Sequence, residues 1–387
     1  MFVGKTASVS GTAGVILAYA CLAFPDSIGL VAERLRLGGF ASSLVFAWFG
    51  ILSLPSGMLC GRFGSRGVAS AALLFSLPAL ALMAVGGASS VAAAAGLAMM
   101  GAANVALQVA LPSRISEIFG NVRQSSVMTV GLFAKTLCAM CIPWALAMFS
   151  SYGEWRLVFP AFGVVFALAT LALMRDRCAA TTVRSSANMR LVLEVAGDVP
   201  TLLAAISFSV GVVADISFNL SVPPTVRERF ASGDGAIGAV YAVLFGVKLP
   251  VTLAGAWLFS RFDLRRLFPV SIAVAMAGGI VFALATSLPA YLAGVALFAA
   301  GYANVYGFVF AIAAPRHSAD RSPSVSALLV MSVAGGAVAS PLISALGAIL
   351  TSPAETVAVA ATGVLLILSA LADVSSRRCS LRTMCSS

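Results

Sequence analysis

The apolar positions of this chain gather into long runs that short polar gaps separate. A helix needs about 20 mostly apolar residues to cross a bilayer, and twelve runs of about this length are present. They cover 6–26, 40–60, 67–88, 91–112, 127–149, 157–174, 199–222, 236–260, 267–287, 290–314, 324–350 and 355–373. The pattern predicts an all-α integral membrane protein with twelve transmembrane helices.

A longer polar stretch divides the chain near its middle. Residues 175–198 contain the charged side chains Arg175, Asp176, Arg177, Arg184, Arg190, Glu194 and Asp198. We therefore expect an N-terminal six-helix half over 1–174, a linker over 175–198, a C-terminal six-helix half over 199–374 and a tail over 375–387.

Composition supports the membrane assignment. Hydrophobic residues make up 60% of the chain and charged residues only 10%, whereas soluble domains carry about 25% charged residues. So few charges cannot cover a soluble globule of this length, but they suffice for a bundle that faces lipid.

The net charge of +10 reflects orientation in the membrane. The basic residues lie in the gaps between apolar runs and form no basic patch with aromatic residues, which argues against nucleic acid as a partner. If both termini are cytoplasmic, the outer loops hold only Arg34, Arg36, Arg156, Arg227 and Arg229 of the 24 basic residues, and Lys135 and Lys248 lie within spans. The positive-inside rule then favours a cytoplasmic (inner) membrane protein with cytoplasmic ends.

The two halves share short motifs in the same order. Residues 31–34 recur at 226–229, 62–66 at 261–265, and 101–105 at 301–305. A duplicated six-helix unit predicts a pseudo-twofold axis between the halves, with a binding site near the membrane midplane.

Residues 57–66 resemble the loop signature G-x-x-x-D-R-x-G-x-R of the major facilitator superfamily. Gly57, Arg62, Gly64 and Arg66 match this signature, and Gly61 stands at the acidic position. The resemblance implies a secondary transporter that works by alternating access, with residues 57–66 as a gating loop.

Two further segments extend this resemblance over essentially the whole chain. Gly153, Trp155 and Arg156 are similar to the G-W-R element of the superfamily with one inserted residue, and Arg261 and Arg265 repeat the gating loop in the second half.

A finer resemblance connects the chain with the fucose-type sugar:proton symporters. It is carried by residues 24–28 at the end of the first span and by the Gly- and Ala-rich fourth span, which ends at Pro112. In that family a first-span Asp and a fourth-span Glu carry proton coupling. Asp26 occupies the Asp position, and Gln108, which cannot titrate, is the nearest polar match for the Glu. The resemblance implies a sugar-like solute moved together with protons.

Four ionisable residues lie inside predicted spans: Asp26, Lys135, Asp215 and Lys248. Each such residue costs about 2.5–3.5 kcal/mol at a helix centre, so they are candidates for function. A partly desolvated carboxyl can exchange a proton near neutral pH, which makes Asp26 the first candidate for proton coupling and Asp215 the second. Alternatively, the four charges neutralise one another and stiffen the bundle.

Other polar residues share helix faces with these charges. Tyr19 precedes Asp26 by seven positions, and Asn219 follows Asp215 by four, so each pair lies on one stripe. The predicted substrate site comprises Tyr19, Asn104, Gln108, Lys135, Asn219, Lys248, Asn304 and Tyr306. Asn side chains also join helices by hydrogen bonds, which leaves a structural role open for Asn104 and Asn304.

The sequence thus leaves two solutes open: a neutral sugar-like solute with coupling at Asp26, or a small organic anion held by the lysines. A non-transporting membrane sensor with the same fold is a further alternative. Enzymatic function is not expected, because the only histidine, His317, has no catalytic partner or metal cluster around it. Cys138 and Cys141 form a C-x-x-C without further ligands. We expect no cofactor, and a solute, a proton and lipid as partners of a monomer.

Overall fold

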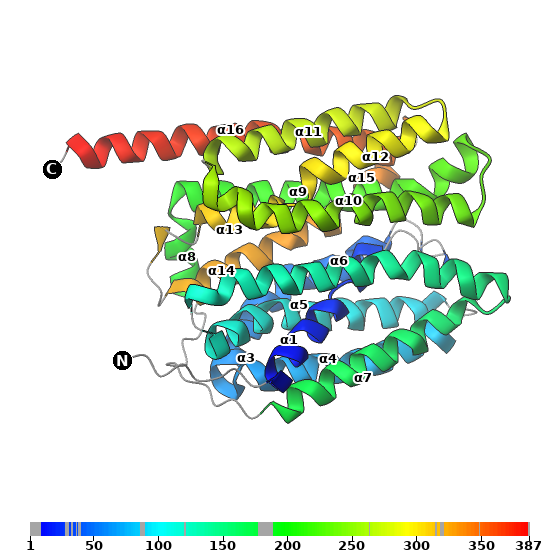
Figure 1. The fold of residues 1–387 in the computed structure, drawn as a ribbon, viewed down its shortest axis with the longest axis horizontal. Helices are drawn as coiled ribbons and strands as arrows, with labels where there is room; N and C mark the ends of the chain where they lie inside the picture. Colours follow the sequence, from blue (N-terminus) through cyan, green and yellow to red (C-terminus); the bar gives the residue numbers. More distant parts are fainter. Residues whose placement is uncertain are drawn as a thin grey trace.

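The computed structural model describes residues 9–27, 31, 34–35, 37, 40–85, 90–119, 121–176, 189–262, 264–313, 316–317, 321–347 and 349–385. The described chain is helical throughout its regular structure, and its helices run roughly side by side as one elongated bundle (Figure 1). The expected all-α architecture is therefore present.

The first helices lie together on one side of the bundle and are called the N-terminal group (Figure 1). They are α1 (Val9–Cys21), the 3₁₀ turn η1 (Phe24–Ser27), α3 (Ala41–Phe63), α4 (Ser65–Val85), α5 (Ser90–Phe119), α6 (Asn121–Ser151), η4 (Trp155–Leu157) and α7 (Val158–Arg175).

The remaining helices form the other side and are called the C-terminal group (Figure 1). They are α9 (Val199–Pro224), η5 (Thr225–Arg229), α10 (Asp234–Arg261), α11 (Leu264–Leu284), α12 (Leu288–Tyr302), α13 (Val305–Ala313), α14 (Ser322–Ser332), η8 (Val333–Gly335), α15 (Gly336–Leu346) and α16 (Pro353–Cys385). The short helix α8 (Met189–Ala196) lies within the predicted linker and buries Val192 and Val195.

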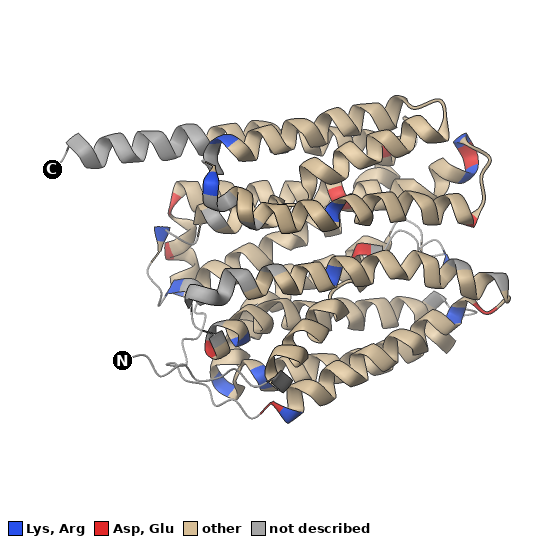
Figure 2. Ribbon diagram, viewed as in Figure 1, with Lys and Arg blue, Asp and Glu red and all other residues tan. Residues whose placement is uncertain are grey.

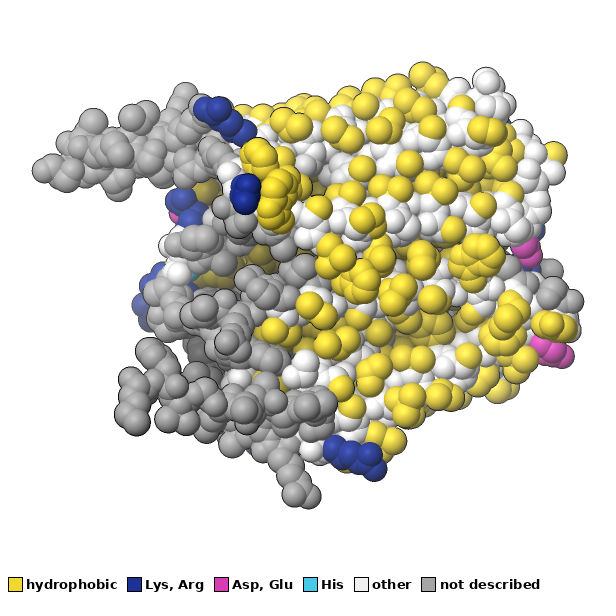
Figure 3. Space-filling model, in the orientation of Figure 1, with side chains coloured by type: hydrophobic (Ala, Val, Ile, Leu, Met, Phe, Trp, Pro, Cys, Tyr) yellow, Lys and Arg dark blue, Asp and Glu magenta, His cyan; other side chains and the backbone are white. Residues whose placement is uncertain are grey.

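Eleven helices in the described part of the chain are long and apolar enough to cross a membrane, and the shorter apolar helix 11–26 adds to them. Apolar side chains cover the flank of the molecule (Figure 3), and charged residues gather toward the two ends of the helices (Figure 2). The protein is therefore a multi-pass membrane protein whose apolar flank faces lipid.

Three of the predicted spans are interrupted inside the bundle. The first span changes from α1 to a 3₁₀ turn at Phe24, the tenth is broken between Tyr302 and Val305, and the eleventh contains the 3₁₀ turn η8. Apolar patterning does not reveal such breaks, because both helical parts of a span remain apolar. Irregular backbone is tolerated at membrane depth only where protein buries it or where it borders a cavity.

The ends of the bundle are named by the connections that they hold. The end at which α7 ends, α9 begins and α3 meets α4 is called the linker end, and the other is called the opposite end. At the linker end Asp198 caps α9, since its carboxylate accepts hydrogen bonds from the Thr201 amide and hydroxyl. The two groups enclose a buried space between them, to which several elements contribute side chains.

Candidate functional site

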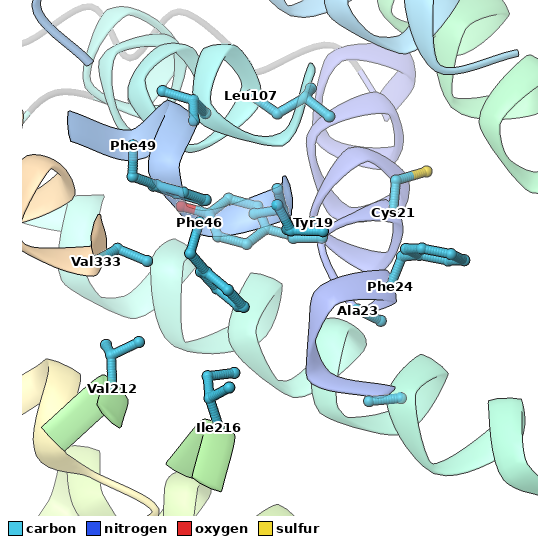
Figure 4. Packing of buried hydrophobic residues seen from close by; sticks show 14 of the residues in the cluster. Tyr19, Cys21, Ala23, Phe24, Phe46, Phe49, Leu107, Val212, Ile216 and Val333 are labelled. Carbon is cyan, nitrogen blue, oxygen red and sulfur yellow. The ribbon is translucent and has the colours of Figure 1, made fainter. Parts of the chain in front are cut away.

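A cavity lies between the two groups and is lined by residues from both. Its volume is about 210 Å³, which is below the ~300–1,000 Å³ of sites for drug-sized ligands. Phe46 and Tyr19 of the N-terminal group face Val212, Ile216 and Val333 of the C-terminal group across this region (Figure 4). The cavity therefore suits a small solute held between the groups.

Most of the predicted site residues meet at this cavity. Its wall contains Tyr19, Asp26, Gln108, Lys135, Asp215, Lys248, Asn304 and Tyr306. They come from helices that lie far apart in the sequence, namely α1–η1, α5, α6, α9, α10 and α12–α13. The breaks after α1, after α12 and at η8 all border the same space, since Pro25, Ala303 and Val333 line it.

Asp26 and Lys135 form an ion pair across the N-terminal side of the cavity. Lys135 Nζ lies 3.0 Å from Asp26 Oδ1, and the two side chains remain 22% and 25% exposed. Asp26 stands in the turn η1, and Lys135 comes from α6, so the pair joins two elements of the N-terminal group.

Asp215 and Lys248 form a second ion pair on the C-terminal side. Lys248 Nζ donates to Asp215 Oδ1 at 2.9 Å, and the side chains are 13% and 16% exposed. The ammonium also lies 5.7 Å from the ring centroid of Phe245 and 5.3 Å from that of Tyr302. Such cation–π contacts add to the ionic attraction, so this pair is held more firmly and is less exposed than the first.

Three asparagines were predicted to contribute to the site, and the structure places them differently. Asn304 lines the cavity and donates to the Val251 carbonyl of α10 at 2.9 Å. Asn104 is 1% exposed and accepts a hydrogen bond from Gln108 at 3.0 Å. Asn219 is 1% exposed and donates to the Asp215 carbonyl of its own helix at 2.8 Å. Asn104 and Asn219 are thus buried and do not line the cavity, and each forms its hydrogen bond with a residue of its own helix.

The sequence reasoning missed three polar residues of the wall, Thr136, Thr252 and Tyr302. Both threonines direct their hydroxyls to the carbonyl four residues earlier, Leu132 and Lys248 respectively. Thr136 directly follows Lys135, and Thr252 follows Lys248 by one helical turn. These sequence positions beside charged residues of the spans could have identified both threonines as part of the site. Tyr302 follows no such pattern, and its contact with the Lys248 ammonium, 5.3 Å from the ring centroid, depends on the packing of α12 against α10.

The wall carries two carboxylates and two ammonium groups, so its formal charges sum to zero. The described residues include no cluster of three or more histidine, cysteine or acidic side chains that could hold a metal ion. Among the cysteines, Cys138 and Cys141 are free thiols. What the cavity can offer chemically is charge, hydroxyl groups and aromatic faces for binding.

The loop that resembles the gating signature lies at the linker end. Gly64 ends α3 with φ +80°, a left-handed conformation that favours glycine, and Gly57 is buried in α3. Arg62 stacks on the neighbouring Phe63 ring at 5.3 Å. Arg66 donates to the Asp176 carbonyl at the end of α7. This hydrogen bond attaches the loop to the C-terminal end of α7, the last helix of the N-terminal group.

The counterpart loop in the C-terminal group has a different environment. Arg261 lies over the ring of Trp257, 5.2 Å from its centroid, and the side chain of Arg265 lies outside the described residues. In the second resembling element, Gly153 has φ +77°, and Arg156 lies 5.8 Å from the Trp155 ring centroid.

A buried charge cluster beside the first loop was not anticipated. Arg114, in the C-terminal part of α5, is 3% exposed and pairs with Asp176, which is 0% exposed, and with Glu117 at 2.9 Å. Ser65 donates to the same Glu117 carboxylate at 2.6 Å. The cluster joins α4, α5 and the end of α7. Its residues sit in polar gaps of the sequence, where burial cannot be recognised from hydropathy.

Polar contacts cross between the two groups at the opposite end. The Ser42 hydroxyl donates to Ser340 Oγ at 2.7 Å, and Ser43 donates to the Ala337 carbonyl at 2.7 Å. Arg34 pairs with Asp234 at the start of α10. In this conformation the groups are therefore joined at the opposite end.

Comparison with known proteins gives a family and a fold. The sequence profile of the Major Facilitator Superfamily matches residues 15–341. None of the curated proteins compared with the chain gives a match. Among solved structures, FucP, a Major Facilitator Superfamily transporter in the outward conformation, superposes with a TM-score of 0.67 at 14% identity, covering 93% of this chain and 98% of that one.

A variant of the E. coli Fucose:proton symporter, FucP, superposes with a TM-score of 0.68 at 14% identity, covering 95% of this chain and 99% of that one. At this identity the likeness concerns the fold. The resemblance inferred from residues 57–66 and 24–28 is confirmed at the level of family and fold.

Proposed function

Because this chain belongs to the Major Facilitator Superfamily, we propose that it is a secondary transporter that carries a small polar solute through its central cavity by alternating access. The observation that supports this most is the position of the cavity between the two groups, with polar and charged side chains from both. A site shared by two bodies can be exposed first to one side of the membrane and then to the other.

The proposal includes the full membrane arrangement that the sequence predicts. The two groups correspond to two six-helix halves with a pseudo-twofold axis, twelve spans in all, in an inner membrane with both termini cytoplasmic. The transporter acts as a monomer, since the cavity is built from one chain. Reporter fusions to the C-terminus that become active outside the cytoplasm would contradict this orientation.

We assign proton coupling to Asp26. Its ion pair with Lys135 is more exposed to the cavity than the pair of Asp215 and Lys248, so a proton reaches it more readily. It stands in the 3₁₀ turn η1 that follows α1, and it lines the cavity. FucP, the structural neighbour with this fold, is a fucose:proton symporter, which agrees with proton coupling here.

The test is uptake into proteoliposomes of a panel of sugars and small carboxylates, with and without a pH gradient. Asp26→Asn resembles the permanently protonated carboxyl, so it should abolish accumulation driven by the pH gradient. Exchange of labelled for unlabelled solute needs no net proton movement and should survive. The matched variant Asp215→Asn tests the second candidate in the same assay.

Two outcomes contradict the assignment. Uphill accumulation by Asp26→Asn at the parental rate would place the proton elsewhere, with Asp215 as the next carrier. Loss of exchange together with accumulation, in a variant that unfolds at the parental temperature, would mean that Asp26 binds the solute.

A further inference from the structure

We infer that the solute moved with the proton is a small monocarboxylate, and that its carboxylate binds Lys135 in the place that Asp26 occupies in this conformation. The inference rests on the proposed function and specifies its substrate class. It follows from the pairing of the cavity charges, which the sequence alone left open.

Of the two ion pairs in the cavity, the pair of Lys135 with Asp26 can break more readily than the pair of Lys248 with Asp215. Lys248 is held by Asp215 at 2.9 Å and by the rings of Phe245 and Tyr302. The described ionic partner of Lys135 is Asp26 at 3.0 Å, and both side chains keep about a quarter of their surface exposed, 22% and 25%. Breaking the Asp26 pair therefore disturbs fewer contacts and leaves the other lysine in place.

Charge balance then selects the solute. With both pairs formed, the cavity is neutral. A proton on Asp26 leaves the Lys135 ammonium, which is only 22% exposed, without its counter-charge, and a largely buried charge without a partner is unfavourable. A neutral sugar does not remove this cost. A monoanion does, because its negative charge restores neutrality and its oxygens accept the hydrogen bonds of the ammonium.

The groups around Asp26 allow the carboxylate of a solute to replace that of Asp26 as the partner of Lys135. The titratable groups close enough for their charge to interact with that of Asp26 are Lys135 and Cys138 from α6, Asp215 from α9, Lys248 from α10 and Tyr302 from α12. Lys135 is the nearest cation among them. An incoming carboxylate at Lys135 reproduces the arrangement of the empty protein, with the transferred proton retained on Asp26.

The cavity also limits the size of this anion. Its volume of about 210 Å³ excludes large amphiphilic acids. Thr136 and Tyr19 of the N-terminal group carry hydroxyl groups, while Leu132 and Pro25 of the same group supply apolar contact. A short hydroxylated or aliphatic monocarboxylate fits these features.

The experiment uses matched pairs of acid and neutral analogue in proteoliposomes: lactate with lactamide, and galacturonate with galactose. Each is tested with an imposed pH gradient alone and with an imposed membrane potential alone. One proton and one monoanion carry no net charge, so the pH gradient should drive uptake of an acid and the potential should not. The neutral analogues should not be accumulated.

Substitutions of Lys135 and Asp26 test whether acid uptake depends on this ion pair. Lys135→Met should lose acid uptake, and Lys135→Arg, which keeps the cation, should retain part of it. Binding of the transported acid to purified parent protein should tighten by up to about tenfold per unit decrease in pH, because one proton binds with it. In Asp26→Asn the affinity should be independent of pH, while a merely structural role of Asp26 predicts no such loss of pH dependence.

The result that overturns the inference is pH-driven accumulation of a neutral analogue with its acid excluded, or acid uptake that Lys135→Met leaves unchanged. Either result leaves the proposed transport function standing. Uptake of acids that no pH gradient can drive would instead contradict proton coupling, and with it the proposed role of Asp26.

Discussion

At the scale of single residues, Asp198 connects two segments at the linker end. Its carboxylate accepts the Thr201 amide at 3.2 Å and forms a two-point contact with Arg316 at 2.6 and 2.9 Å. The hydrogen bonds from Arg316 are the largest cause that lowers the pKa of Asp198, to about 2. The group thus remains ionised over the whole physiological range.

This lowered pKa has a defined effect on stability. The unfolded chain holds the proton more tightly, with a pKa of about 3.9, so ionised Asp198 stabilises the fold above about pH 4. The contribution should be lost as the pH falls from about 4 toward 2. Thermal unfolding in detergent between these pH values should therefore show the parent losing more stability than Asp198→Asn.

Two substitutions of Asp198 distinguish its ion pair with Arg316 from its role as the N-cap of α9. Asp198→Asn keeps an oxygen that can cap α9 and removes the ion pair, whereas Asp198→Ala removes both. Loss of an N-cap typically costs about 1 kcal/mol, so the alanine variant should be the less stable one at pH 7. Equal stability of both variants would contradict the capping role.

At the scale of elements, α10 and the break between α12 and α13 are joined at Asn304. Its amide donates to the Val251 carbonyl at 2.9 Å. A Cβ on Gly255 would lie 2.3 Å from Asn304 Oδ1, so glycine at this position lets the asparagine approach the helix. This hydrogen bond holds the interrupted α12–α13 span against α10, the helix that carries Lys248, beside the cavity.

Gly255→Ala should force Asn304 away from α10. Overpacking of this kind costs about 1–3 kcal/mol, which should appear as a lower unfolding temperature, together with weaker solute binding. The matched control is Gly246→Ala in the same helix, where an added Cβ meets no atom within 4 Å. It should be neutral or up to about 1 kcal/mol more stable, because alanine favours a helix over glycine. Equal behaviour of both variants would contradict a role for this contact.

At the scale of the whole molecule, the described polar contacts distinguish the two ends. At the opposite end Ser42 meets Ser340, and Arg34 meets Asp234, across the two groups. The pair of Arg114 with Asp176 at the linker end lies within the N-terminal group. Alternating access requires that the cross-group contacts at the opposite end separate once in each cycle.

A reversible crosslink tests this requirement. The Ser42 and Ser340 oxygens are 2.7 Å apart, so cysteine sulfurs at the same two positions lie near each other, and a disulfide has an S–S length of about 2.05 Å. In the double variant Ser42→Cys with Ser340→Cys, oxidation should stop transport and a reductant should restore it. The single variants control for the native thiols, and peptide mass spectrometry locates the bond. Full transport by the crosslinked protein would show that the groups do not separate there.

The sequence by itself determined the membrane character and much of the fold. Apolar runs of spanning length, scarce charge and the basic loops depend only on local composition, and the structure places helices at each of the predicted runs. The candidate site was also largely visible, because a charge such as Asp26 or Lys248 within an apolar run is costly and therefore conspicuous.

Only the tertiary structure decided how these residues are arranged. Pairing of Asp26 with Lys135, and of Asp215 with Lys248, depends on helix rotation and on contacts between elements distant in sequence. The same applies to Asn104, which is buried beside Gln108 and does not line the cavity. Helix periodicity shows which residues share a face, but it does not show what that face meets. That choice is made by packing, and here it pairs the four charged side chains of the cavity two by two, so that their formal charges cancel.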